Sequence, residues 1–284
     1  MSVIDTHAGS QIRASTSGEP AIFFASNMDV NTDGASRSYH PDDPRGNLGI
    51  ALNNMGNAIS DIYDPSGRRI TCSPRQGACY DRFIKTFEAS RDADYAQQGY
   101  PRFTTDSMIP WRLDPETGYQ KPCIGQNGYF VSQTAAIVAP DADKCDQRRY
   151  LDALEFNAIV LPTGKKWRSQ GVVTDDWDLS VIIDAETGEV AFAINGDRGP
   201  RSKIGEGSVR LVTELGQTSV PDRATYRQIR ELARAKVYTV IFPTWDIQRL
   251  TNRNGFTQND VDRLGAEALA AFGGVERLRA CIGG

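Results

Sequence analysis

The segment LSVIIDAETGEVAFAINGDRGPRSKIGEGSVRL (residues 179–211) carries the strongest secondary-structure signals of this 284-residue chain. Two apolar runs, 179–184 and 189–195, flank the turn sequence AETG, which predicts a β-hairpin. The chain then enters a loop rich in glycine and charge. It continues into the alternating sequence 208–215, which predicts another strand. This segment therefore predicts a strand–loop–strand unit inside a β-rich core.

Further strands and a few helices are expected around this unit. Apolar or alternating runs predict strands at residues 21–26, 128–135, 156–162 and 237–243. Helical periodicity predicts helices at residues 80–89, 223–235 and 257–272. Ser219 and Asp222 predict a capping box that leads into the helix at 223–235, whereas Thr257 to Asp260 open the last helix and Gly273 ends it. Strands dominate, so we expect a mainly β fold.

The expected domain organisation is simple. Residues 1–20 are polar and rich in Ser, Gly and Thr, which predicts a flexible N-terminal arm. Residues 21–284 are expected to form a single domain. Residues 27–58 read as a long loop, and an elaborated insertion is expected at about 40–128.

Composition excludes two classes of function. The net charge is −4 at pH 7, and nucleic-acid binding needs a concentrated basic surface, so no nucleic-acid partner is expected. The longest apolar runs, 21–25 and 237–242, are far shorter than the ~20 residues of a spanning helix, so no membrane insertion is expected. The first twenty residues lack a Sec signal peptide. A removed signal, another export route and an intracellular location all remain open.

The five cysteines allow two interpretations. Cys72 with Cys79, and Cys123 with Cys145, could form disulfides and leave Cys281 over, or all five could be reduced and buried. No CxxC pair occurs and the chain has only two histidines, so a Cys/His zinc site is not expected.

The candidate chemistry is that of carboxylates. Both histidines lie in polar N-terminal sequence, no GxSxG turn is present, and no P-loop or strand-linked GxGxxG occurs. Asp197 directly follows the predicted strand 189–195, and Glu206 directly precedes the next one. Glycines at 196, 199, 205 and 207 leave space for a ligand around both acids.

Two such carboxylates at one end of a sheet suit hydrolysis of a glycosidic bond. One protonates the leaving oxygen, and the other acts as base or nucleophile. A separation near ~5 Å favours retention, whereas ~6.5–9.5 Å leaves room for a water and favours inversion. The alternative is an exposed turn whose acidic residues only interact with solvent, because the spacing of the two acids is unspecific by itself.

Two further features could contact a ligand. Asp29, Asn31, Asp33 and Gly34 match the opening of an EF-hand loop, but the twelfth position is His40, so an Asx-rich turn or a sugar-binding loop is favoured over a calcium site. Sugar rings stack on exposed aromatic side chains. The candidates are Tyr129 and four tryptophans, Trp111, Trp167, Trp177 and Trp245. Trp167, within GKKWRSQG, is expected to be the most exposed of the tryptophans.

Three pieces of the sequence together resemble the fungal-type chitosanases, glycoside hydrolase family 75. They are ASNMDVNTDG (25–34), GYFVSQT (128–134) and AFAINGDRGPRSKIGEGSVRL (191–211), and they occur in the order of that family. The late strand VYTVIFP also fits. The resemblance implies a six-stranded double-psi β-barrel and an inverting, endo-acting hydrolase of β-1,4-linked glucosamine polymers. It also implies that no cofactor or metal is needed.

The same resemblance implies roles for particular residues. Asp197 and Glu206 take the two essential acidic positions, with Glu206 as general acid and Asp197 as base, or the reverse. Asp29, Asn31 and Asp33 would line the cleft. The expected substrate-binding residues are Asp29, Asn31, Asp33, Tyr129 and Trp167.

The chain departs from the family through the insertion at 40–128, the C-terminal extension and the lack of a secretion signal. We therefore expect a secreted chitosanase, with two alternatives. One is a peptidoglycan-cleaving antibacterial effector, for which an export machinery or an immunity protein is an expected partner. The other is a non-catalytic glycan-binding module.

Overall fold

A computed structural model describes residues 1–15, 18–72, 77–125, 127–162, 167, 171–251 and 255–283. The chain divides into two compact units rather than the single domain expected over 21–284. Unit 1 comprises Met1–Asn31, Ala153–Val220 and Leu232–Gly284, and unit 2 comprises Thr32–Asp152 and Pro221–Glu231. The residues expected to form an insertion at 40–128 therefore all lie within unit 2.

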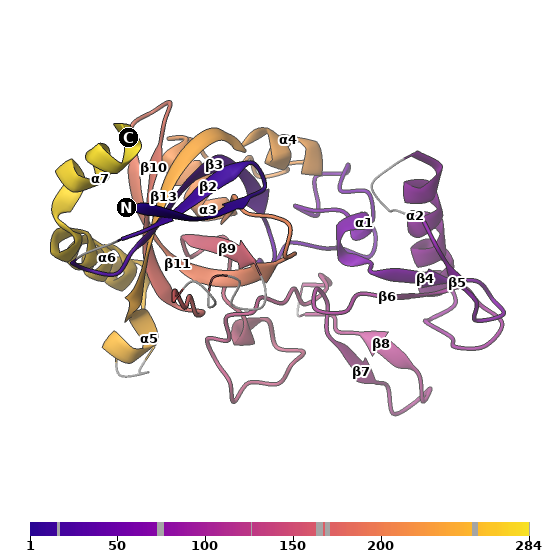
Figure 1. The fold of residues 1–284 in the computed structure, drawn as a ribbon. Helices are drawn as coiled ribbons and strands as arrows, with labels where there is room; N and C mark the ends of the chain where they lie inside the picture. The colour runs from indigo at the N-terminus through magenta and orange to yellow at the C-terminus, as the bar shows by residue number, and fades with distance from the viewer. Residues whose placement is uncertain are drawn as a thin grey trace. The chain divides into compact units, whose positions relative to one another are not determined.

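Unit 1 is built on a closed barrel of six strands (Figure 1), which confirms the expected mainly β fold with a six-stranded barrel core. The strands are β3 (Ile22–Asn31), β9 (Ala158–Pro162), β10 (Asp178–Asp184), β11 (Val190–Gly199), β12 (Glu206–Ser208) and β13 (Arg234–Asp246). Their order is β3-β12-β9-β11-β10-β13, and β13 pairs with β3 to close the barrel. The β3–β12 and β9–β11 pairs are parallel, and the other four are antiparallel.

Successive side chains of the barrel strands pack on opposite sides of the barrel wall. On β3, Ile22 and Phe24 join one buried cluster, whereas Phe23 joins another, because successive side chains of a strand point to opposite faces. The second cluster includes Phe272 from α6 (Gln258–Phe272) and Leu278 from α7 (Gly274–Gly283). Helix α6 begins at the expected place, where Thr257 and Asp260 form a capping box, and Gly273 ends it with a φ of 116°.

The N-terminal residues are a β-hairpin and not the expected flexible arm. Strands β1 (Ser2–His7) and β2 (Ser10–Ala14) pair with each other, and β2 pairs with β3. Ile12 is fully buried in the same cluster as Ile22. Local composition does not show which residues are buried against distant parts of the chain. For this reason the polar residues 1–20 predicted a flexible arm.

The sequence 208–215 is a helix, so the predicted strand there is wrong. Only Glu206–Ser208 form β12, and Val209–Leu215 form α3. Ser208 caps this helix, because its Oγ accepts a hydrogen bond from the Leu211 amide at 3.2 Å. The buried residues of this helix are Val209, Leu211, Val212 and Leu215. Val209, Val212 and Leu215 recur every three residues, as on one face of a helix, whereas Val209, Leu211 and Leu215 gave the alternation that predicted a strand.

Two other predicted elements differ in the structure. Residues 128–135 form no strand, and Phe130 makes only isolated bridges with Tyr39 and Ile124. The helix expected at 223–235 is short, α4 (Tyr226–Glu231), because the chain from Arg234 onward pairs within the barrel as β13. The hairpin of β10 and β11 is confirmed. A short helix, α5 (Ile247–Leu250), follows β13.

Unit 2 has its own apolar core, which includes Phe83, Phe87, Phe103 and Phe130. Its elements are α1 (Met55–Ala58), β4 (Asp61–Tyr63), β5 (Arg69–Ile70), α2 (Gly77–Asp92), β6 (Arg102–Thr104), β7 (Trp111–Leu113), β8 (Gln120–Pro122) and η1 (Gln147–Arg149), together with α4. The predicted helix at 80–89 corresponds to α2. Disulfides join Cys72 to Cys79 and Cys123 to Cys145, whereas Cys281 in unit 1 is free.

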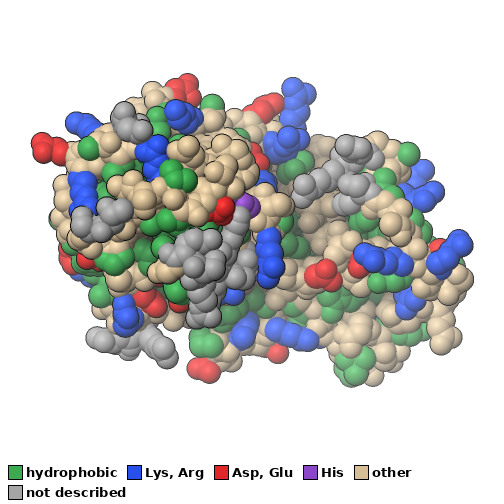
Figure 2. All heavy atoms as spheres, viewed as in Figure 1, with side chains coloured by type: hydrophobic (Ala, Val, Ile, Leu, Met, Phe, Trp, Pro, Cys, Tyr) green, Lys and Arg blue, Asp and Glu red, His purple; other side chains and the backbone are tan. Residues whose placement is uncertain are grey.

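Neither positive nor negative side chains dominate the face of the molecule that Figure 2 shows. On the face drawn in Figure 2, acidic and basic side chains are scattered among polar and apolar ones, as the small net charge implies. Within the described parts of the chain, no helix combines the length and the apolar character needed to cross a membrane.

Gly205 is required by the turn that leads into β12. Its φ is +84°, and a Cβ atom there would lie 2.2 Å from the carbonyl oxygen of Asn27. We predict that Gly205→Ala lowers the free energy of unfolding by more than about 3 kcal/mol. Gly188→Ala is the control, because Gly188 has a φ of +74° but open space around it, and should cost only about 1–2 kcal/mol. Equal losses in urea denaturation would contradict the steric argument.

Asp178 should make stability depend on pH. Its side chain is 1% exposed, and burial raises its pKa to about 8; the charges of Asp175, Asp246 and Asp176 add to this, although a backbone hydrogen bond opposes it. Because the folded pKa lies above the ordinary 3.8, the stabilising contribution is complete below about pH 4 and is lost as the pH rises toward 8. The loss is on the order of a few kcal/mol.

Asp178→Asn should remove this loss, since asparagine keeps an acceptor for the Asp175 amide but does not ionise. Chemical denaturation between pH 5 and 8.5 measures the effect. We expect stability to fall with pH more steeply in the original protein than in the variant. Parallel curves for the two proteins would show that Asp178 does not titrate as described.

Candidate active site

Four barrel strands align three acidic residues in one row. Asp29 on β3 pairs with Glu206 on β12, Glu206 pairs with Val160 on β9, and Val160 pairs with Asp197 on β11. Residues opposite each other on neighbouring strands project to the same face of a sheet. Three acids from distant parts of the sequence therefore lie along one row, with Val160 between Glu206 and Asp197.

The Glu206 side chain extends across β9 toward β11. A Cβ atom at Gly199 would lie 3.3 Å from Oε2 of Glu206 and 3.1 Å from Cγ1 of Val160. Gly199 is two residues beyond Asp197 on β11, and residues two apart share a face of a strand. Asp197 and Glu206 therefore project on the same side, and the missing side chain at Gly199 leaves space for the Glu206 carboxylate.

The strand spacing limits how far apart the two acids lie. Asp197 and Glu206 are separated by one intervening strand, which puts their backbones about 9–10 Å apart at a spacing of ~4.8 Å per strand. Both side chains reach over that intervening strand. The two side chains therefore approach each other from opposite sides of β9.

Lys203 binds two of the three acids. Its Nζ lies 2.5 Å from Oε1 of Glu206 and 3.1 Å from Oδ2 of Asp29. Burial would lower the pKa of Lys203, but the hydrogen bonds and charges of Glu206 and Asp29 outweigh burial and raise it. The side chain therefore stays an ammonium. Sequence reasoning missed Lys203, although its position three residues before Glu206 in the glycine-flanked loop was a usable signal.

Asp197 is held from two sides. Asn31 Nδ2 donates a hydrogen bond to Oδ2 of Asp197 at 3.0 Å, and the Arg198 amide donates to Oδ1 at 2.9 Å. The Arg198 guanidinium turns away to Asp176, at 2.7 Å, so its charge is balanced there. The structure thus brings together four of the expected site residues, Asp29, Asn31, Asp197 and Glu206, and adds Lys203.

The site is negatively charged and open to solvent. Counting only these named residues of the described part of the chain, three carboxylates and one ammonium give a formal charge of −2. Side-chain exposure is 47% for Asp29, 37% for Lys203 and 21% for Glu206. A cationic ligand can therefore approach the row and would be attracted by it.

Trp167 is not an exposed stacking platform, so that expectation is wrong. The residue is 1% exposed and packs in the barrel core, and its Nε1 donates a hydrogen bond to Oδ2 of Asp5 at 3.1 Å. Its polar sequence neighbours suggested exposure, but the indole packs against residues that are distant in sequence. Those neighbours, 163–166 and 168–170, lie outside the described residues.

Asp33 and Tyr129 belong to unit 2, and each takes part in a hydrogen bond within that unit. The Tyr39 hydroxyl donates to Oδ1 of Asp33 at 2.8 Å, and the Tyr129 hydroxyl donates to the carbonyl of Ile50 at 3.2 Å. The expected role of both in substrate binding remains a prediction. Over the described ranges, no group of three or more His, Cys, Asp or Glu side chains is arranged to hold a metal ion.

Comparison with known proteins leaves the family open. The sequence matches no protein-family model, and it has no match among curated proteins. The resemblance to the chitosanases therefore rests on the three motifs and on the residues quoted for them.

Proposed function

We propose that this protein is an inverting glycoside hydrolase that cleaves β-1,4-linked glucosamine polymers. The observation that carries the proposal is the placement of Asp197 and Glu206 opposite the same residue, Val160, on its two sides. Two carboxylates that project to one face from either side of a strand suit the proposed inverting mechanism, in which a water enters beside the sugar.

The contacts of the two acids suggest how the work is divided. In Glu206, Oε1 is bound by Lys203, so Oε2, beside Gly199, is the oxygen available to protonate the leaving group. Asp197 is oriented by Asn31 and by the Arg198 amide, and a carboxylate held in this way can act as the base toward an attacking water. Glu206 is thus proposed as acid and Asp197 as base.

The charge of the site favours glucosamine over acetylated polymers. The deacetylated amino group of glucosamine is a cation at neutral pH, and the row of Asp29, Glu206 and Asp197 carries a net negative charge even with Lys203 in place. Peptidoglycan glycan strands carry acetylated amino groups and would gain less from this field. Chitosan is therefore the proposed substrate, ahead of peptidoglycan.

The two disulfides are compatible with an extracellular protein. We accordingly place the proposed activity outside the cytoplasm, where a polysaccharide substrate is accessible.

Replacement of either acid should abolish hydrolysis. Asp197→Asn and Glu206→Gln should each lower the rate of reducing-end release from chitosan by about 10²–10⁴-fold, because general acid and base contributions are of that size. Glu276→Gln is the control, since Glu276 is exposed on α7, far in sequence from the row. Near-normal activity in either acid variant would refute the assignment. Chitosan binding without any reducing ends in the original protein would indicate a glycan-binding module instead.

The pH profile of kcat/KM in Lys203→Met should show whether Glu206 is the general acid or the general base. The variant removes the ammonium that contacts Glu206, and a nearby positive charge favours the ionised form of a carboxylate in general. If Glu206 is the acid, the alkaline limb of the kcat/KM profile should move to higher pH; if Glu206 is the base, the acidic limb should move instead. Lys203→Arg keeps the charge and should leave both limbs close to their original positions. A profile unchanged in Lys203→Met would show that the ion pair does not influence catalysis.

A further inference from the structure

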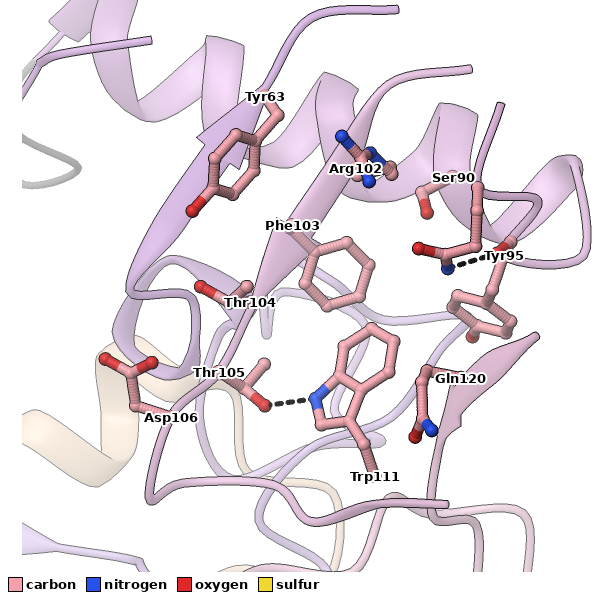
Figure 3. A pocket seen from close by; sticks show the side chains of 11 residues that line it. Tyr63, Ser90, Tyr95, Arg102, Phe103, Thr104, Thr105, Asp106, Trp111 and Gln120 are labelled. Carbon is pink, nitrogen blue, oxygen red and sulfur yellow. Dashed lines mark hydrogen bonds between the residues drawn. The ribbon is translucent and has the colours of Figure 1, made fainter. Parts of the chain in front are cut away.

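Unit 2 contains an open pocket of about 440 Å³ (Figure 3). Its lining comes from the end of α2 and the loop after it, and from the short strands β4, β6, β7 and β8 with their connections. All of these segments belong to one unit, and none contributes to the row of acids on the barrel. The volume lies in the range typical of small-molecule sites.

Aromatic rings form the apolar part of this pocket. Phe103 and Trp111 meet edge to face with ring centroids 5.1 Å apart, and Tyr95 lies 6.2 Å from Trp111. Trp111 Nε1 donates a hydrogen bond to Oγ1 of Thr105 at 2.7 Å, so the polar edge of the indole is already satisfied (Figure 3). The rings are therefore free to offer apolar surface to a ligand.

Two hydroxyls in the pocket wall, on residues that are otherwise buried, lack partners among the described residues. Ser90 is 3% exposed and Tyr95 is 6% exposed. Neither side-chain hydroxyl forms a hydrogen bond with any residue that the structure describes. Burial raises the pKa of Tyr95, so its hydroxyl stays neutral and can both donate and accept. Both hydroxyl oxygens are accessible from the pocket, so they can hydrogen-bond a ligand that enters it.

The pocket also contains strained backbone. Tyr95 and Asp106 have positive φ angles of 60° and 41°, a region that residues other than glycine rarely occupy. Such strain persists where the surroundings hold a residue in place, and it is concentrated at binding sites. Arg102 and Asp106 contribute one charge of each sign, so the formal charges of the lining cancel.

We propose that this pocket binds one uncharged pyranose unit. The C–H faces of such a ring stack on aromatic side chains such as Phe103 and Trp111. Its hydroxyls would pair with Ser90 and Tyr95 along the side where Figure 3 also shows Gln120. The balanced charge favours a neutral sugar over glucosamine. This site is distinct from the acidic row and does not depend on the proposed hydrolysis.

The test uses the full chain and N-acetylglucosamine as the neutral probe, titrated by NMR. We expect saturable binding that Ser90→Ala and Tyr95→Phe each weaken by about two- to tenfold, the value of one hydrogen bond. Because each change removes a hydroxyl without a protein partner, the melting temperature should stay the same or rise. Tyr100→Phe is the control, since Tyr100 is exposed in the same unit and does not line the pocket.

Three results would overturn the proposal. They are the absence of saturable binding, binding that neither hydroxyl variant weakens, and tighter binding of cationic glucosamine that depends on the same two hydroxyls. Each is independent of the chitosan assay, so failure here and failure of the proposed hydrolysis can be told apart.

Discussion

The pairing of Val160 with Glu206 on one side and with Asp197 on the other is the constraint on which the candidate site depends. Strand β12 is only three residues long, and its neighbours β3 and β9 hold it in register. Gly205 makes this possible, because its carbonyl accepts the Asp29 amide at 2.8 Å in a conformation that a side chain would block. The backbone thereby sets the spacing of the acids before any side chain is considered.

Electrostatics then decides what the row can bind. Lys203 neutralises part of the charge of Asp29 and Glu206, and this makes three nearby carboxylates tolerable in a half-exposed position. The remaining negative charge can still attract a cation. In the proposed hydrolase, the ammonium of a glucosamine unit would compete with Lys203 for the same carboxylate oxygens. The pocket of unit 2 has balanced charge and aromatic walls, which suits a different, neutral partner.

Local sequence patterns predicted several elements correctly, and their failures have physical causes. The β10–β11 hairpin and the capped helix α6 were predictable, since turn residues and caps act over a few positions. The alternating pattern at 208–215 suits both a strand and a helix, and the Ser208 cap, with burial of Val209 and Val212, selects the helix. The N-terminal hairpin and the buried Trp167 depend on partners far away in the chain.

The sequence by itself determined the mainly β character, the identity of Asp197 and Glu206 as candidates, and the glycines around them, because these are properties of short segments. Only the tertiary structure decided how the expected residues Asp29 and Asn31 meet the two acids, that Lys203 lies between carboxylates, and that Thr32–Asp152 and Pro221–Glu231 form a second unit. The Asn31–Asp197 hydrogen bond spans 166 positions of sequence. Such contacts arise from strand pairing around a closed barrel, and no local pattern encodes which strands become neighbours.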